Sequence, residues 1–173
     1  MLGDLTEKIQ ASQNKIEALA ARIPGYRGYK AREQRREADK LLRLHIARQY
    51  EAQMTRLQDI QSRMVDAGQL NALFAMERAV MRLQLLIDRI KTASYGYSGM
   101  FDAVKVDEAA LDRLYDFDRA MLDSVEGLAS RIDALDEAVG SGAPASPAVN
   151  ELLNELRALN DTFSTRQDVI LAI

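Results

Sequence analysis

Apolar residues recur at alternating steps of three and four through most of this chain, and this spacing constrains the fold more than any other feature of the sequence. Residues at such steps share one face of an α-helix, whereas a half-buried strand needs strict alternation of apolar and polar residues. No stretch between turn-forming residues alternates in that way. The sequence therefore predicts an all-α protein.

The positions of the helix-breaking residues divide the chain into five predicted helices. Proline occurs only at Pro24, Pro144 and Pro147, and most glycines lie between the periodic segments. The predicted helices span about residues 4–23, 29–67, 70–94, 107–139 and 147–171. Gly68 is expected to end the second helix, and Ser146 to cap the fifth ahead of Pro147. We expect residues 1–173 to form a single domain, since this length suits one core.

Short connections between these helices favour an elongated antiparallel bundle of about five helices with coiled-coil-like packing. Residues 29–94 are expected to form a long helical hairpin that turns near Gly68. Equal rises along its two helices place Tyr95 opposite about Leu41. The part of the second helix before Leu41 should therefore project beyond the third, and the helix over residues 4–23 is its expected cover.

Asp118 occupies one of the apolar positions of the fourth predicted helix. A carboxylate buried there costs stability unless it finds a charged or hydrogen-bonding partner. The register count suggests Arg48 or His45 as that partner. A structural role in fixing the helix register is the simplest interpretation, and a catalytic role would need a second polar cluster.

The residues that usually carry catalysis or metal binding do not form a recognisable pattern in this sequence. There is no cysteine, and the single histidine, His45, has no glutamate at the Glu-x-x-His spacing of di-iron bundles. Neither a nucleophile motif nor a phosphate-binding loop follows a strand. We predict no enzymatic activity and no catalytic, cofactor-binding or metal-binding residue.

The stretch "GYRGYKAREQRREADK", residues 25–40, is the strongest candidate for a binding surface. Between Arg22 and Arg48 the chain carries nine basic residues against three acidic ones, and few apolar side chains interrupt the basic helix. A second turn of similar composition, "YGYSG", lies at residues 95–99. The predicted partner-binding residues are Tyr26, Arg27, Tyr29, Lys30, Arg32, Arg35 and Arg36, with Tyr95 and Tyr97 as a second patch.

Three interpretations of this basic segment remain open. It can pair with the acidic fourth helix or with a second copy of the chain, it can bind an anionic membrane surface, or it can bind nucleic acid. The net charge of −3 weakens the nucleic-acid interpretation. We predict a non-enzymatic helical scaffold or adaptor that self-associates as a homo-oligomer, with peripheral membrane binding and nucleic-acid association as alternatives.

We expect the protein to be soluble and to lie in the cytoplasm. The first ten residues lack the basic and apolar regions of a secretory signal. The apolar runs fall far short of the ~20 residues that span a bilayer. Association with a membrane would therefore be peripheral.

Overall fold

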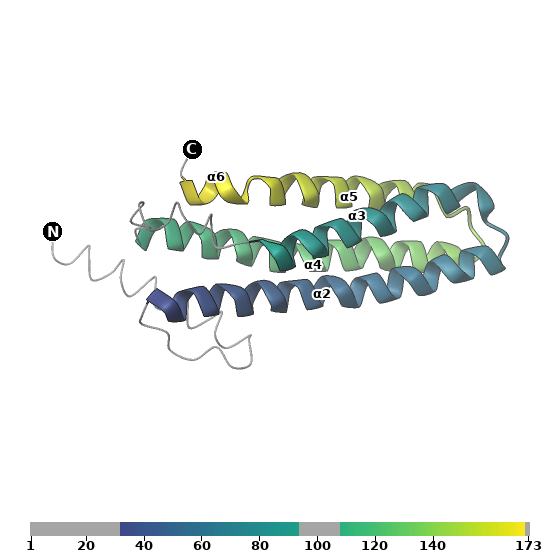
Figure 1. Cartoon of the computed structure of the whole chain (residues 1–173). Helices are drawn as coiled ribbons and strands as arrows, with labels where there is room; N and C mark the ends of the chain where they lie inside the picture. Colours follow the sequence, from purple (N-terminus) through teal and green to yellow (C-terminus); the bar gives the residue numbers. More distant parts are fainter. Residues whose placement is uncertain (1–31, 94–107, 172–173) are drawn as a thin grey trace.

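The computed structural model describes residues 32–93 and 108–171, and within them the side chains of residues 40–93, 113–166, 168 and 169 (Figure 1). The described residues form helices α2 (Arg32–Asp66), α3 (Leu73–Thr92), α4 (Glu108–Gly140), α5 (Ser146–Ser164) and α6 (Arg166–Leu171), and the short 3₁₀ helix η1 (Leu70–Ala72). No strand occurs among them, which confirms the all-α prediction. The helix predicted over residues 4–23 lies outside the described residues.

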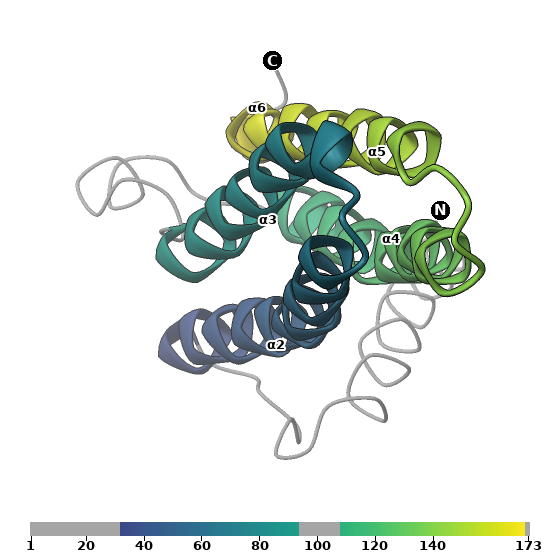
Figure 2. The same cartoon turned by 90° about the vertical axis from the view of Figure 1, so that its right-hand side faces the viewer.

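Four long helices pack side by side into an elongated bundle (Figure 1). Helices α2 and α3 form one antiparallel hairpin, and α4 and α5 form the other. Helix α2 packs against both α3 and α4, and α5 also packs against both α3 and α4. Seen down the bundle, α3 and α4 occupy opposite corners (Figure 2).

The two hairpins stack so that adjacent helices from different hairpins run parallel, an arrangement that the sequence analysis did not anticipate. Arg56 and Arg63 of α2 form ion pairs with Asp133 and Asp136 of α4, so residue numbers rise together along these two helices. Gln69 hydrogen-bonds to the α4–α5 turn, while Arg89 reaches Ser164 near the end of α5, so α3 and α5 also run in one direction. The antiparallel prediction holds only within each hairpin.

In both hairpins, a glycine with positive φ follows the end of the first helix. Gly68 has φ +68° and Gly142 has φ +74°, a left-handed conformation that glycine adopts without a steric penalty. After Gly68, the N–H of Gln69 donates to the carbonyl of Met64 at 2.9 Å, as in a Schellman motif. The predicted stop at Gly68 is confirmed.

The core consists mainly of the predicted apolar positions of α2, α3, α4 and α5. Leu57, Leu83, Leu128 and Leu156 are fully buried, one from each helix. Because α3 ends at Thr92 while α2 begins at Arg32, α2 does extend beyond α3, as predicted. Parallel pairing brings the start of α4 beside about residue 37 of α2, so α4 accompanies much of this extension.

Buried polar side chains join the helices at the end of the bundle where α3 stops. The guanidinium of Arg43 donates to the carbonyls of Ile90 and Lys91, each at 3.3 Å, and so satisfies the C-terminal carbonyls of α3. The phenol of Tyr50 lies 3.0 Å from the carbonyl of Met121 on α4 and 2.7 Å from Oγ of Ser124. These bonds fix the level at which α2 meets its neighbours.

The fifth predicted helix requires two corrections. The helix begins at Ser146, one residue before the predicted start at Pro147. The N-cap residue is therefore Ala145 instead of Ser146, and it provides no side-chain cap. The helix also breaks at Thr165, which separates α5 from α6. Ser164 Oγ donates to the carbonyl of Asn160 and Thr165 Oγ1 to that of Thr162, and such back-bonding competes with regular helix geometry.

Candidate functional site

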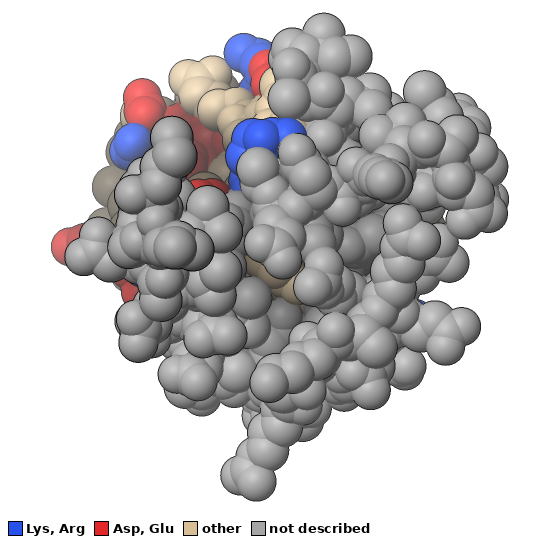
Figure 3. Space-filling model, turned by 90° about the vertical axis from the view of Figure 1, so that its left-hand side faces the viewer, with Lys and Arg blue, Asp and Glu red and all other residues tan. Residues whose placement is uncertain are grey.

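The structure leaves the basic segment of the sequence largely untested as a binding surface. Tyr26, Arg27, Tyr29, Lys30, Tyr95 and Tyr97 lie outside the described residues. Arg32, Arg35 and Arg36 belong to the first turns of α2, but their side chains also lie outside the described part. Figure 3 looks onto this end of the bundle, where the described surface carries both basic and acidic side chains.

The acidic α4 does pair with α2, but farther along than the basic segment. Asp133 and Asp136 of α4 bind Arg56 and Arg63 in the second half of α2. All four side chains are substantially exposed, so each pair contributes little to stability. These ion pairs join the two hairpins within one chain.

Asp118 is buried at the interior position predicted for it, with only 3% of its side chain exposed. Arg166, at the start of α6, donates to both carboxylate oxygens at 3.2 and 3.3 Å. The register count did not consider this helix, and Arg48, one of the two expected partners, is exposed. Because a bidentate Arg–carboxylate pair satisfies both charges, we assign Asp118 a structural role: it holds α6 against α4.

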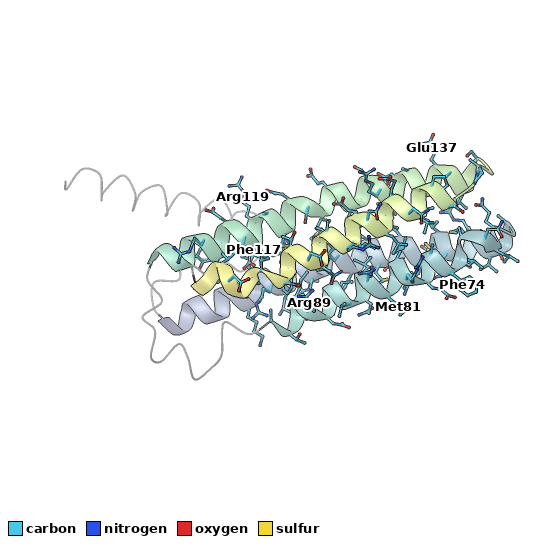
Figure 4. All side chains as sticks on the ribbon, turned by 90° about the horizontal axis from the view of Figure 1, so that it is seen from above. Phe74, Met81, Arg89, Phe117, Arg119 and Glu137 are labelled. Carbon is cyan, nitrogen blue, oxygen red and sulfur yellow. The ribbon has the colours of Figure 1, made fainter. Side chains whose placement is uncertain are left out.

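The outer side of α3 carries an apolar stripe that the core does not use. Five large apolar side chains are exposed among the described residues, and all of them lie between Val65 and Leu85. Phe74 is 81% exposed and Met81 66%, and both project from the same outer side of α3 (Figure 4). We use the name apolar stripe for Leu70, Phe74, Met81 and Leu85. Leu70 lies in η1 directly before α3, and at 100° per residue the three members in α3 fall within an arc of ~40°.

Beside the apolar stripe, α3 and α5 form a hollow of about 300 Å³ that we call the arginine groove. It is lined by Arg78 and Arg82 from α3 and by Asn150, Leu153, Asn154 and Arg157 from α5. Leu153 is the only apolar residue of this lining, and it is buried. The lining includes no carboxylate.

The three arginines of the groove differ from most other arginines of the described structure. Eight of those arginines use their guanidinium groups in ion pairs or hydrogen bonds: Arg43, Arg56, Arg63, Arg89, Arg113, Arg119, Arg131 and Arg166. Four do not do so within the described part of the chain: Arg48, Arg78, Arg82 and Arg157. Three of those four line one hollow.

Asn160 holds α5 against α3 through the backbone of Arg82, one of the residues that line the groove. It is buried, and its Nδ2 donates to the carbonyl of Arg82 at 3.0 Å. Arg89 in turn donates to the carbonyl of Asn160 at 2.9 Å and stacks over the ring of Phe163, 5.3 Å from its centre. These contacts fix the spacing of the helices that form the arginine groove.

Sequence reasoning missed this face because α3 has apolar residues on two sides. The inner residues, such as Met76 and Leu83, account for the three/four spacing, and Phe74 and Met81 lie outside that spacing. The missed signal was the second set at Leu70, Phe74, Met81 and Leu85, because one helix face cannot bury both sets.

Comparison of the chain with protein-family models, curated proteins and solved structures gives no match. Within residues 32–93 and 108–171, no helix is both long and apolar enough to cross a bilayer. The described residues also hold no cluster of three or more side chains of the kinds that bind metals.

Proposed function

We propose that the protein is a non-enzymatic helical interaction module that self-associates through the outer face of α3. The observation that carries this proposal is the apolar stripe on an otherwise charged bundle. Contiguous exposed apolar side chains on a soluble domain are typical of a contact surface. Phe74 at its centre is the kind of aromatic anchor that dominates such contacts.

Charge on the two flanks of the stripe favours one orientation of a second copy. Arg78 and Arg82 lie on the flank toward α5, whereas Glu77 lies on the flank toward α2, by their angles around α3. If two α3 helices paired antiparallel, the arginine flank of one copy would lie against the arginine flank of the other, and like charges would repel. In a parallel pair, Arg82 of each copy would face Glu77 of the other, as e and g positions do in a coiled coil.

A parallel, in-register pair also places apolar side chains on equivalent ones of the second copy. Phe74 would meet Phe74, and Met81 would meet Met81. Full burial contributes about 1.5–3 kcal/mol for each large side chain, while association costs about 4–15 kcal/mol. The resulting affinity should be modest, with a dissociation constant in the micromolar to millimolar range.

Sedimentation velocity over a wide concentration range tests self-association. The double variant Phe74→Glu/Met81→Glu should remain monomeric where the wild type associates. Ser130→Glu, at an exposed position on α4, is the matched control and should associate like the wild type. Circular dichroism of each variant checks that the fold is retained. A wild type that stays monomeric at millimolar concentration contradicts the proposal, as does a double variant that associates normally.

The absence of cysteine from the chain gives a direct test of orientation. The single variant Met81→Cys should form a disulfide-linked dimer under mild oxidation if the α3 helices pair in parallel. A mixture of Phe74→Cys and Met81→Cys chains should instead cross-link to each other if they pair antiparallel. Disulfide formation at Ser130→Cys gives the background rate of random collision.

A further inference from the structure

We infer that the arginine groove between α3 and α5 binds a phosphate-type polyanion, such as pyrophosphate or a phosphomonoester group. Three arginines from two helices line the groove, and its lining contains no acidic side chain. All residues of the groove belong to one chain, so the site does not require the proposed self-association, although Arg78 and Arg82 also flank the α3 contact.

The arrangement of charge points to an anion. Arg78 and Arg82 lie four residues apart on α3, where like charges repel and lower the stability of the helix. Arg157 adds a third positive charge from α5. A dianionic or more highly charged ligand would relieve this repulsion.

The chemistry of the lining favours phosphate among anions. Guanidinium groups bind phosphate through two parallel N–H···O bonds, and such charge-assisted bonds are stronger than neutral ones. The side-chain amides of Asn150 and Asn154 add neutral donors at the opposite wall. A hollow of about 300 Å³ lies at the lower end of small-molecule sites, so it suits a multi-oxygen group better than a monatomic anion.

Isothermal titration with inorganic pyrophosphate at low ionic strength is the first test. We expect saturable binding that weakens about tenfold in Arg157→Gln and further in Arg78→Gln/Arg157→Gln. Binding should also weaken as salt is raised. Arg48→Gln is the matched control, because Arg48 is likewise exposed and makes no ion pair within the described residues, yet lies on α2 away from the groove.

Flotation with vesicles distinguishes a free phosphate from a lipid headgroup. The probe is phosphatidylcholine vesicles containing phosphatidic acid, compared with phosphatidylcholine alone. Groove-dependent binding to pyrophosphate only assigns a soluble ligand, and groove-dependent binding to the acidic vesicles only assigns a lipid phosphate. If neither probe binds, or if the groove variants bind as the wild type does, the inference is wrong.

The same titration in the uncharged double variant Phe74→Gln/Met81→Gln, which removes the apolar anchors without adding carboxylates beside Arg78 and Arg82, separates this site from self-association. That variant keeps every residue of the groove, so pyrophosphate binding should change less than about twofold if the groove acts alone. Loss of binding in this variant, with the fold intact, would make the site a product of the paired chains and overturn its independence. Self-association in Arg157→Gln should match the wild type, since Arg157 takes no part in the proposed α3 pairing.

Discussion

Removing one member of the buried pair formed by Asp118 and Arg166 should destabilise the bundle strongly, whereas removing both should not. The two side chains are 3% and 4% exposed, and their closest N···O distance is 3.2 Å. At an effective dielectric constant of about 20, two unit charges ~4 Å apart attract by about 4 kcal/mol. Burial of either charge without the other costs about 3–5 kcal/mol. We therefore expect Asp118→Leu and Arg166→Met each to lower the free energy of unfolding by that amount.

The double variant Asp118→Leu/Arg166→Met should lie within about 1 kcal/mol of the wild type, or above it, because both charges of the pair are removed together. The coupling free energy of this double-mutant cycle should then exceed about 4 kcal/mol. Arg131 and Glu151 provide the control cycle, since they link α4 to α5 at 3.5 Å with side chains 48% and 60% exposed. Their coupling should be only about 0.2–1 kcal/mol.

Urea unfolding followed by far-ultraviolet circular dichroism measures the wild type and the six variants of the two cycles. An unchanged dependence of the unfolding free energy on urea concentration shows that the variants differ in stability rather than in compactness. In a chain of this length, each single variant should also melt about 10 °C lower. If Asp118→Leu and Arg166→Met each cost about 1 kcal/mol and simply add in the double variant, the desolvation argument for this pair is wrong.

Three further predictions concern the core and the turns. Burial, with a smaller contribution from Glu155, raises the pKa of Tyr50 to about 12. Above pH 10 the folded protein therefore keeps the phenol proton that the unfolded chain loses. The stability from this proton is complete below about pH 10 and is lost toward pH 12, and urea unfolding at about pH 11 should show a loss of about 1 kcal/mol that Tyr50→Phe lacks. Gly68→Ala should lower the free energy of unfolding by about 1 kcal/mol, because Gly68 has a positive φ. Gly127→Ala, in the interior of α4, should raise it by about 0.5–1 kcal/mol, since the added Cβ would meet only Glu155, at 3.6 Å. Thermal melts compare the two variants. Asn160→Ala should cost about 1–3 kcal/mol in urea unfolding through its lost bonds to α3, and Asn154→Ala, exposed on the same helix, less than about 0.5 kcal/mol.

The helices themselves were predictable from the sequence because their signals are local. The three/four spacing of apolar residues and the glycine at Gly68 locate α2 and α3 to within a few residues of the described ends. The break at Thr165 was not predictable in the same way, because the apolar spacing continues across it through Phe163 and Ile170. The hydroxyl groups that compete for backbone carbonyls there act over one turn and leave the periodicity unchanged.

The candidate site was less predictable than the fold. Net charge along the sequence directed attention to residues 22–48, where basic residues are close in sequence. The arginine groove instead joins Arg78 and Arg82 to Arg157, which lies 75 residues beyond Arg82 in a different hairpin. No local pattern connects these residues, since their proximity depends on which helices the bundle makes neighbours.

That choice of neighbours is made by polar contacts between the hairpins. Apolar burial is non-directional, so the cores of two amphipathic hairpins can be buried with α2 beside either α4 or α5. Only the first arrangement gives the buried phenol of Tyr50 its partners on α4, and only it lets Asn160 bind the backbone of α3 at Arg82. Leaving either group buried without a partner would cost about 1–3 kcal/mol, enough to select one stacking over the other. Because Asn160 bonds to the backbone of Arg82, which lines the arginine groove, the contact that selects the stacking also brings Arg82 of α3 close to Arg157 of α5. The groove is therefore a consequence of how the hairpins stack, and its variants should leave that stacking unchanged.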